Sequence, residues 1–131
     1  MKKDFGLWID HKKAVIVNMM DGSIRTMLSG LEQVFPASGS HGFSGIGAKD
    51  FPAEDIHDRH MDKHLQLFYE QVAKTIQSPD HLYVFGPGEA KIEFTRVAGR
   101  LGAKVEAVEP ADHLTDRQIV AKVRQHFVNA A

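Results

Sequence analysis

A glycine-rich segment over residues 36–51 carries the side chains best suited to contact a nucleic acid. Glycine lets the backbone approach a ligand closely, an aromatic ring can stack on a base, and a lysine can meet a phosphate. Segments of this length without periodicity are usually functional or disordered, so the pattern predicts an RNA-contacting loop, with a flexible connection as the alternative. The candidate RNA-binding residues of this loop are His41, Gly42, Phe43, Gly45, Gly47 and Lys49.

Basic residues outside the loop could extend a phosphate-binding surface. Lys91 ends the segment 86–91, a predicted strand-to-helix turn whose free amides could hold an anion, although a purely structural turn is the favoured interpretation. The segment lacks the pattern of a nucleotide-binding P-loop and of a dinucleotide fingerprint, so no nucleotide cofactor is expected. The remaining candidates could form a discontinuous phosphate-binding surface, although a solvated helix face is the default interpretation of each. They are Arg96, Arg100, Arg117, Lys122 and Arg124 on polar faces of predicted helices, together with Lys12, Lys13 and Lys49.

Three histidines share one side of a predicted helix at positions i, i+3 and i+7, namely His57, His60 and His64. Imidazole is a common zinc ligand, which makes the spacing suggestive. The helix rises about 10 Å over this stretch, however, too far for one ion with bonds near 2 Å, so at most two could bind together. No metal site is predicted, and the stripe is expected to border the core and face solvent or RNA.

The composition limits the class of protein. A chain of 131 residues with 43% hydrophobic and 25% charged residues is expected to form a single domain over 1–131. No apolar run reaches the roughly 18 residues of a membrane span and no signal segment follows the N-terminus, so we expect a cytoplasmic protein with no membrane partner. The absence of cysteine excludes disulfides and cysteine nucleophiles. A net charge of -1 means that RNA would have to meet a local basic patch.

The elements that would position these residues begin with three antiparallel strands, predicted from short β-rich runs separated by polar turns. The second turn contains Asp21-Gly22, a strong hairpin signal. After the glycine-rich loop, apolar residues at helical spacing predict a long helix that ends before Pro79. The strands are Leu7–Ile9, Ala14–Val17 and Ile24–Leu28, and the helical stripe is Met61, Leu65, Phe68, Val72 and Ile76.

The second half of the chain alternates strands with helices. A buried strand over 81–85 precedes a helix that closes at Gly102, and a strand over 104–108 precedes a helix with Thr115 and Gln118 as a capping box. Alternation of this kind predicts parallel strands joined by right-handed helical crossovers. The predicted fold is therefore an α/β domain with a mixed sheet. The inward-facing residues of the two helices are Phe94, Val97, Ala98 and Leu101, then Ile119, Val123 and Phe127.

Two segments carry a resemblance to a known family. They run from Leu82 to Phe94 (LYVFGPGEAKIEF) and from Val108 to Ile119 (VEPADHLTDRQI). With the order of elements and the glycine-rich loop before the first helix, they resemble the middle domain of eukaryotic and archaeal peptide-chain release factors and of Pelota. The chain resembles more closely the single-domain bacterial proteins described as translational machinery components, over nearly its whole length.

The resemblance implies a ribonuclease-H-like motif, with a five-stranded mixed sheet, three strands of it antiparallel, flanked by helices. It also implies a translation-associated role with the ribosome or structured RNA as partner. In release factors, a Gly-Gly-Gln tripeptide in the corresponding loop promotes hydrolysis of peptidyl-tRNA. Here no glutamine lies between Gln33 and Gln66, so we expect RNA or ribosome binding without that hydrolysis.

Two alternative functions stay open. Ribonuclease-H-like nucleases carry a metal-binding carboxylate at the end of the first strand, where this chain has Asp10. Two-metal hydrolysis gathers several carboxylates around ions about 4 Å apart, and the candidate partners are Glu109 and Asp112. A solvated hairpin turn is an equal interpretation of Asp10. The other alternative is a homo-oligomeric interaction module, for example a homodimer, with no nucleic-acid role.

Overall fold

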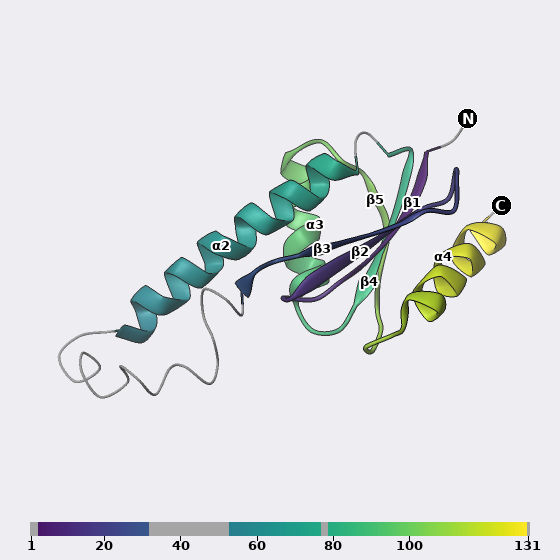
Figure 1. The fold of residues 1–131 in the computed structure, drawn as a ribbon. Coiled ribbons are helices and arrows are strands. Elements are labelled where there is room, and N and C mark those ends of the chain that lie inside the picture. The colour runs from purple at the N-terminus through teal and green to yellow at the C-terminus, as the bar shows by residue number, and fades with distance from the viewer. Residues whose placement is uncertain (1–2, 32–52, 77–78, 131) are drawn as a thin grey trace.

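The computed structural model describes residues 3–31, 53–76 and 79–130, and they form one mixed β-sheet with helices on both faces (Figure 1). Helices α2 and α3 cover one face of the sheet, and α4 covers the other. None of the helices in these ranges is both long and apolar enough to cross a membrane. The elements are β1 (Asp4–Ile9), β2 (Lys13–Asn18), β3 (Ile24–Leu28), α2 (Ala53–Thr75), β4 (His81–Gly86), α3 (Ala90–Arg100), β5 (Val105–Pro110) and α4 (Asp116–Ala130).

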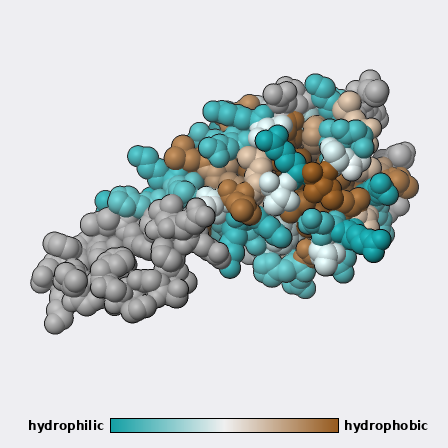
Figure 2. Space-filling model, viewed as in Figure 1, coloured by the Kyte–Doolittle hydropathy of each residue, from teal (hydrophilic) through white to brown (hydrophobic). Residues whose placement is uncertain are grey.

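The five strands lie in the order β3-β2-β1-β4-β5. β2 runs antiparallel to both β1 and β3, whereas β1, β4 and β5 are parallel to one another. This confirms the predicted α/β fold, with three antiparallel strands followed by α-β-α-β-α. β3 forms one border of the described sheet. Figure 2, which has the view of Figure 1, shows hydrophobic surface over the region of β3.

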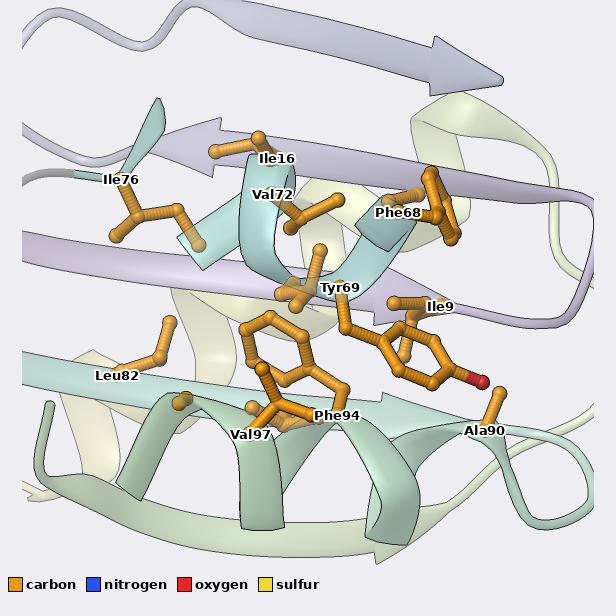
Figure 3. Close-up of a cluster of buried hydrophobic side chains, with 14 of the residues drawn as sticks. Ile9, Ile16, Phe68, Tyr69, Val72, Ile76, Leu82, Ala90, Phe94 and Val97 are labelled. Carbon is orange, nitrogen blue, oxygen red and sulfur yellow. The ribbon is translucent and has the colours of Figure 1, made fainter. Parts of the chain in front are cut away.

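The core on the α2 and α3 face is built from alternate strand residues and the predicted helical stripe (Figure 3). Of that stripe, Met61 is partly buried and the other members are fully buried, which confirms the prediction. The aromatic rings of Tyr69 on α2 and Phe94 on α3 pack edge to face, with their centroids 6.3 Å apart, and so connect the two helices. Leu101 was expected in the core but is 51% exposed, because it is the C-cap residue of α3 and its backbone has left the helix.

The core on the α4 face brings Trp8, Tyr83 and Phe85 against the helix. The predicted capping box is confirmed, since the Thr115 and Gln118 side chains each accept a hydrogen bond from the other's backbone N–H, at 3.2 and 2.9 Å. Ile119 and Val123 are fully buried and Phe127 is partly buried, again as predicted.

Two features of the parallel half result from backbone constraints. At Gly86 (φ 154°) a Cβ atom would lie 2.2 Å from the carbonyl oxygen of Ile9, so this turn requires glycine for steric reasons. The last strand was predicted over 104–108 but runs from Val105 to Pro110. Its end is extended because Pro110 pairs with Gly86, whose carbonyl also accepts a hydrogen bond from Ala111 N at 3.1 Å.

Candidate functional site

Polar side chains concentrate where β1 and β4 end, which we call the carboxyl edge of the sheet. It comprises the β1–β2 turn (10–12), residues 29–31 after β3, the β4–α3 turn (86–90) and the connection 111–115 before α4. Hydrogen bonds hold these segments side by side, for example from Ser29 N to the Lys12 carbonyl at 2.8 Å. In open α/β sheets, ligands bind outside the carboxyl ends of the strands, so this is the first place to look for function.

A carboxylate at this edge joins three elements of the fold. Glu93 Oε1, on α3, accepts a hydrogen bond from the hydroxyl of Tyr69 on α2 at 2.7 Å and lies 3.1 Å from His11 Nε2 in the β1–β2 turn. Burial, together with the bond to Glu93, raises the pKa of Tyr69, so its hydroxyl stays a neutral donor. The side chains of His11 and Glu93 are 44% and 39% exposed and can be reached from solvent.

A second set of bonds fixes the chain after β3. The hydroxyl of Ser29 donates to the carbonyl of His11 at 2.8 Å and accepts from Leu31 N at 3.1 Å. His64 Nε2 donates to the carbonyl of Ser29 at 2.6 Å. Of the other two predicted stripe histidines, His60 is exposed and the side chain of His57 lies outside the described residues. The chain on the N-terminal side of segment 32–52 is therefore anchored to both the β1–β2 turn and α2.

Asp10 organises the β1–β2 turn. Its Oδ1 accepts hydrogen bonds from the backbone N–H groups of Lys12 and Lys13, both at 2.8 Å, and its Oδ2 lies 3.8 Å from Nδ1 of His113. The side chain is only 13% exposed. This geometry is that of a carboxylate closing a tight turn, which is the structural interpretation of Asp10.

The two suggested partners of Asp10 differ in how they are bonded: Glu109 through its carboxylate and Asp112 through its backbone carbonyl. Glu109 Oε1 accepts from the hydroxyl of Tyr83 at 2.6 Å, and burial followed by this bond raises the pKa of Tyr83. The backbone carbonyl of Asp112 accepts from Trp8 Nε1 at 3.0 Å. Within residues 3–31, 53–76 and 79–130, no group of three or more histidines and acids is arranged to hold a metal ion.

The sheet separates the predicted basic residues. On the α3 side, Lys91 Nζ donates to the carbonyl of Gly88 within the β4–α3 turn. On the other side, Arg117 and Arg124 are exposed and Lys122 is half-buried on α4. The predicted loop residues, His41 to Lys49, lie outside the described residues.

The structure brings two of the predicted basic residues, Lys13 and Lys122, over neighbouring aromatic rings. Lys13 Nζ lies 5.5 Å from the ring centroid of Trp8, and Lys122 Nζ lies 6.0 Å from that of Phe85. Trp8 and Phe85 are register partners on adjacent parallel strands, so the two ammonium groups lie over neighbouring rings at the carboxyl edge. We call Lys13 and Lys122 the lysine pair. Its members are more than a hundred positions apart in sequence, and only the sheet register brings them together.

On the face of the sheet that α2 and α3 cover, a groove between these two helices is lined in part by Tyr69 and Glu93. Its volume is about 350 Å³. Asp62 and Glu93 balance Arg96 and Arg100 along its walls, so this groove lacks a charge preference.

These features define an α/β fold with a polar carboxyl edge. No protein-family model and no curated protein sequence matches the chain. Among solved structures, the chain is similar to the Pelota protein of Thermoplasma acidophilum, with a TM-score of 0.57 and 17% sequence identity. The similarity covers 95% of this chain and 32% of the Pelota chain, so this chain spans about a third of that protein's length. The fold is therefore Pelota-like, in agreement with the fold that the sequence resemblance implies.

Proposed function

We propose that this protein is a translation-associated factor that binds the ribosome or structured RNA and does not hydrolyse peptidyl-tRNA. The observation that carries the proposal is the Pelota-like fold over 95% of the chain. The resemblance to release-factor middle domains points in the same direction, and the missing Gly-Gly-Gln tripeptide separates binding from peptide release. Such a role belongs in the cytoplasm.

The carboxyl edge is the proposed contact surface. The predicted RNA-binding loop over 36–51 follows Leu31, which is anchored there through Ser29. The lysine pair lies at the same edge on the α4 side, and α4 also presents Arg117 and Arg124. Ammonium and guanidinium groups within reach of one phosphate backbone give sequence-independent, salt-dependent affinity.

Ribosome co-sedimentation over a series of salt concentrations tests the proposal. We expect the wild-type chain to pellet with ribosomes at low salt and to dissociate as salt rises. Deletion of residues 38–49 should weaken pelleting far more than it lowers the unfolding temperature. Absence of co-sedimentation at low salt would refute ribosome binding, and the same titration with a structured RNA in place of ribosomes identifies which of the two is bound.

A matched pair of double variants tests the contact surface. Lys13→Gln with Lys122→Gln removes the lysine pair, and Lys74→Gln with Lys104→Gln removes two lysines that line a cavity at the opposite edge of the sheet. Each double variant deletes the same number of positive charges. We expect the first to weaken binding about tenfold or more and to flatten its salt dependence, and the second to change it little. Equal losses in both would mean that net charge, and not this edge, controls binding.

A further inference from the structure

At the β3 border of the sheet, backbone hydrogen-bonding groups point away from the other described strands. Within the described strands, β3 pairs only with β2. The bonds from Asn18 N to Ser23 O and from Ser29 N to Lys12 O fix which residues point inward. Because inward and outward groups alternate along an antiparallel strand, the outward-facing N–H and C=O groups belong to Ile24, Thr26 and Leu28.

The side chains of the same three residues share one face of the sheet. Ile24 is 40% exposed and Leu28 is 75% exposed, two of the large hydrophobic residues that the fold leaves open to solvent. Thr26, between them, is also exposed. The β3 border therefore combines backbone groups that pair with no other described strand and apolar side chains that are exposed.

The opposite border of the sheet, β5, is protected in the ways that natural edge strands use. It contains Glu106, Glu109 and Pro110, and its pairing with β4 has a register irregularity. β3 has the sequence Ile-Arg-Thr-Met-Leu and an unbroken register with β2, without proline, lysine or acid. One edge is thus guarded against strand addition and the other is not.

We propose that β3 pairs antiparallel with β3 of a second copy of this chain, about a two-fold axis at Thr26. In that register Thr26 lies opposite Thr26 of the second copy. Ile24 of each copy lies opposite Leu28 of the other copy. All three outward-facing residues become hydrogen-bonded pairs, each exchanging two backbone bonds. The two exposed hydrophobic side chains become cross-strand neighbours, and one sheet runs through both copies.

A second copy fits this edge better than an unrelated strand because the edge is self-complementary. The outward-facing residues are symmetric about Thr26, as a two-fold interface requires. The single charge of the strand, Arg25, comes opposite Met27 and not opposite another arginine. No like charges therefore face each other between the two paired β3 strands.

Sedimentation equilibrium of the full chain tests the proposal, with variants that place a charge at Thr26 on the two-fold axis. The wild type should approach twice the chain mass of 14.6 kDa, and the dimer should persist at salt concentrations that release RNA. Thr26→Lys and Thr26→Glu each place like charges opposite each other and should be monomeric, whereas their equimolar mixture should form a heterodimer. Val108→Lys, the same kind of change on β5, should leave the dimer intact. A monomeric wild type would overturn the proposal, including one that binds an added extended peptide but does not bind a second copy of itself. A dimer that is unaffected by Thr26→Lys would overturn it as well.

Disulfide trapping tests the register, since the chain has no native cysteine. Thr26→Cys should cross-link with itself on oxidation, because directly paired residues have Cα atoms about 5.5 Å apart, within the range of a disulfide. Ile24→Cys and Leu28→Cys should each fail alone and cross-link when mixed. Cross-linking of Ile24→Cys with itself would refute the proposed axis.

Discussion

Val123 of α4 packs directly on Gly6 of β1, and a single methyl group added at Gly6 should disturb the whole α4 layer. A Cβ atom added at Gly6 would lie 2.2 Å from Val123 Cγ2, 2.5 Å from Cγ1 and 2.9 Å from Cβ. Val123 is fully buried, and a β-branched residue in a helix has essentially one χ1 rotamer, so its side chain cannot turn away. In Gly6→Ala, α4 itself must move outward from the sheet.

The cost can be estimated from this geometry. Overpacking a well-packed core by one methyl group costs about 1 to 3 kcal/mol, and the three contacts below 3 Å favour the upper half of this range. For a domain of this size, 1 kcal/mol corresponds to roughly 4 °C in unfolding temperature, so we expect a decrease of about 8 to 12 °C. Urea unfolding followed by Trp8 fluorescence measures the effect directly, because this single tryptophan is buried in the same cluster.

Two further variants separate the clash from other effects of alanine. Gly99→Ala, in α3, meets no atom within 4 Å and should leave stability equal or raise it by up to about 1 kcal/mol. In Gly6→Ala with Val123→Ala, the two Cγ atoms that clash are gone, so the double variant should be clearly more stable than the sum of the single changes predicts. If Gly6→Ala stays within about 0.5 kcal/mol of wild type, or the two changes are additive, the contact does not limit the distance of α4 from the sheet.

Three other perturbations have defined outcomes. The only tyrosines, Tyr69 and Tyr83, both have raised pKa values in the folded protein. Unfolding therefore releases protons above the ordinary tyrosine pKa of 10.0, and the free energy of unfolding should fall as pH rises beyond that value. Tyrosinate absorbance should increase together with alkaline unfolding, and titration of either tyrosine in the folded protein near pH 10 would contradict this. Asp10→Ala should lower the free energy of unfolding by about 1 to 2 kcal/mol, because it removes the acceptor for two backbone N–H groups. Asp10→Asn keeps an acceptor and should have a smaller effect. Magnesium-dependent RNA cleavage by the wild type that is lost in Asp10→Asn would instead support the nuclease alternative. Thr115→Ala should cost about 1 kcal/mol in thermal unfolding through loss of the α4 cap, and an unchanged unfolding temperature would show that the cap is dispensable.

Much of the fold could be predicted because its signals are local. Period-two and helical apolar patterns, the Asp21-Gly22 hairpin and the Thr115 capping box each lie within a few residues, and they locate the elements and the direction of the strands. One error arose from long-range strand pairing and the other from the exact end of a helix. The last strand continues to Pro110 because Gly86 pairs with it, and Leu101 is exposed because the backbone turns at the end of α3.

The candidate site could be predicted only in part, because its contacts are distant in sequence. The sequence marks Asp10 for either metal binding or a turn, and only the structure shows that its Oδ1 accepts hydrogen bonds from two backbone N–H groups of that turn. The contact between His11 and Glu93 joins residues 82 positions apart, with no local pattern to indicate it. The neighbourhood of Lys13 and Lys122 depends likewise on the register of β1 with β4. Sequence periodicity cannot contain this information.

The hydrogen bonds at the carboxyl edge hold several segments of the chain in fixed positions. Asp10 bonds two backbone N–H groups of its own turn, Ser29 bridges that turn to Leu31, and one oxygen of Glu93 receives the Tyr69 hydroxyl. Each of these polar groups therefore fixes one piece of chain to another. An edge held in this way fixes the position of Leu31, the last described residue before segment 32–52. For the proposed function, a positioned edge would favour binding to the ribosome or structured RNA, because positioned cations lose less conformational freedom when they meet a phosphate backbone.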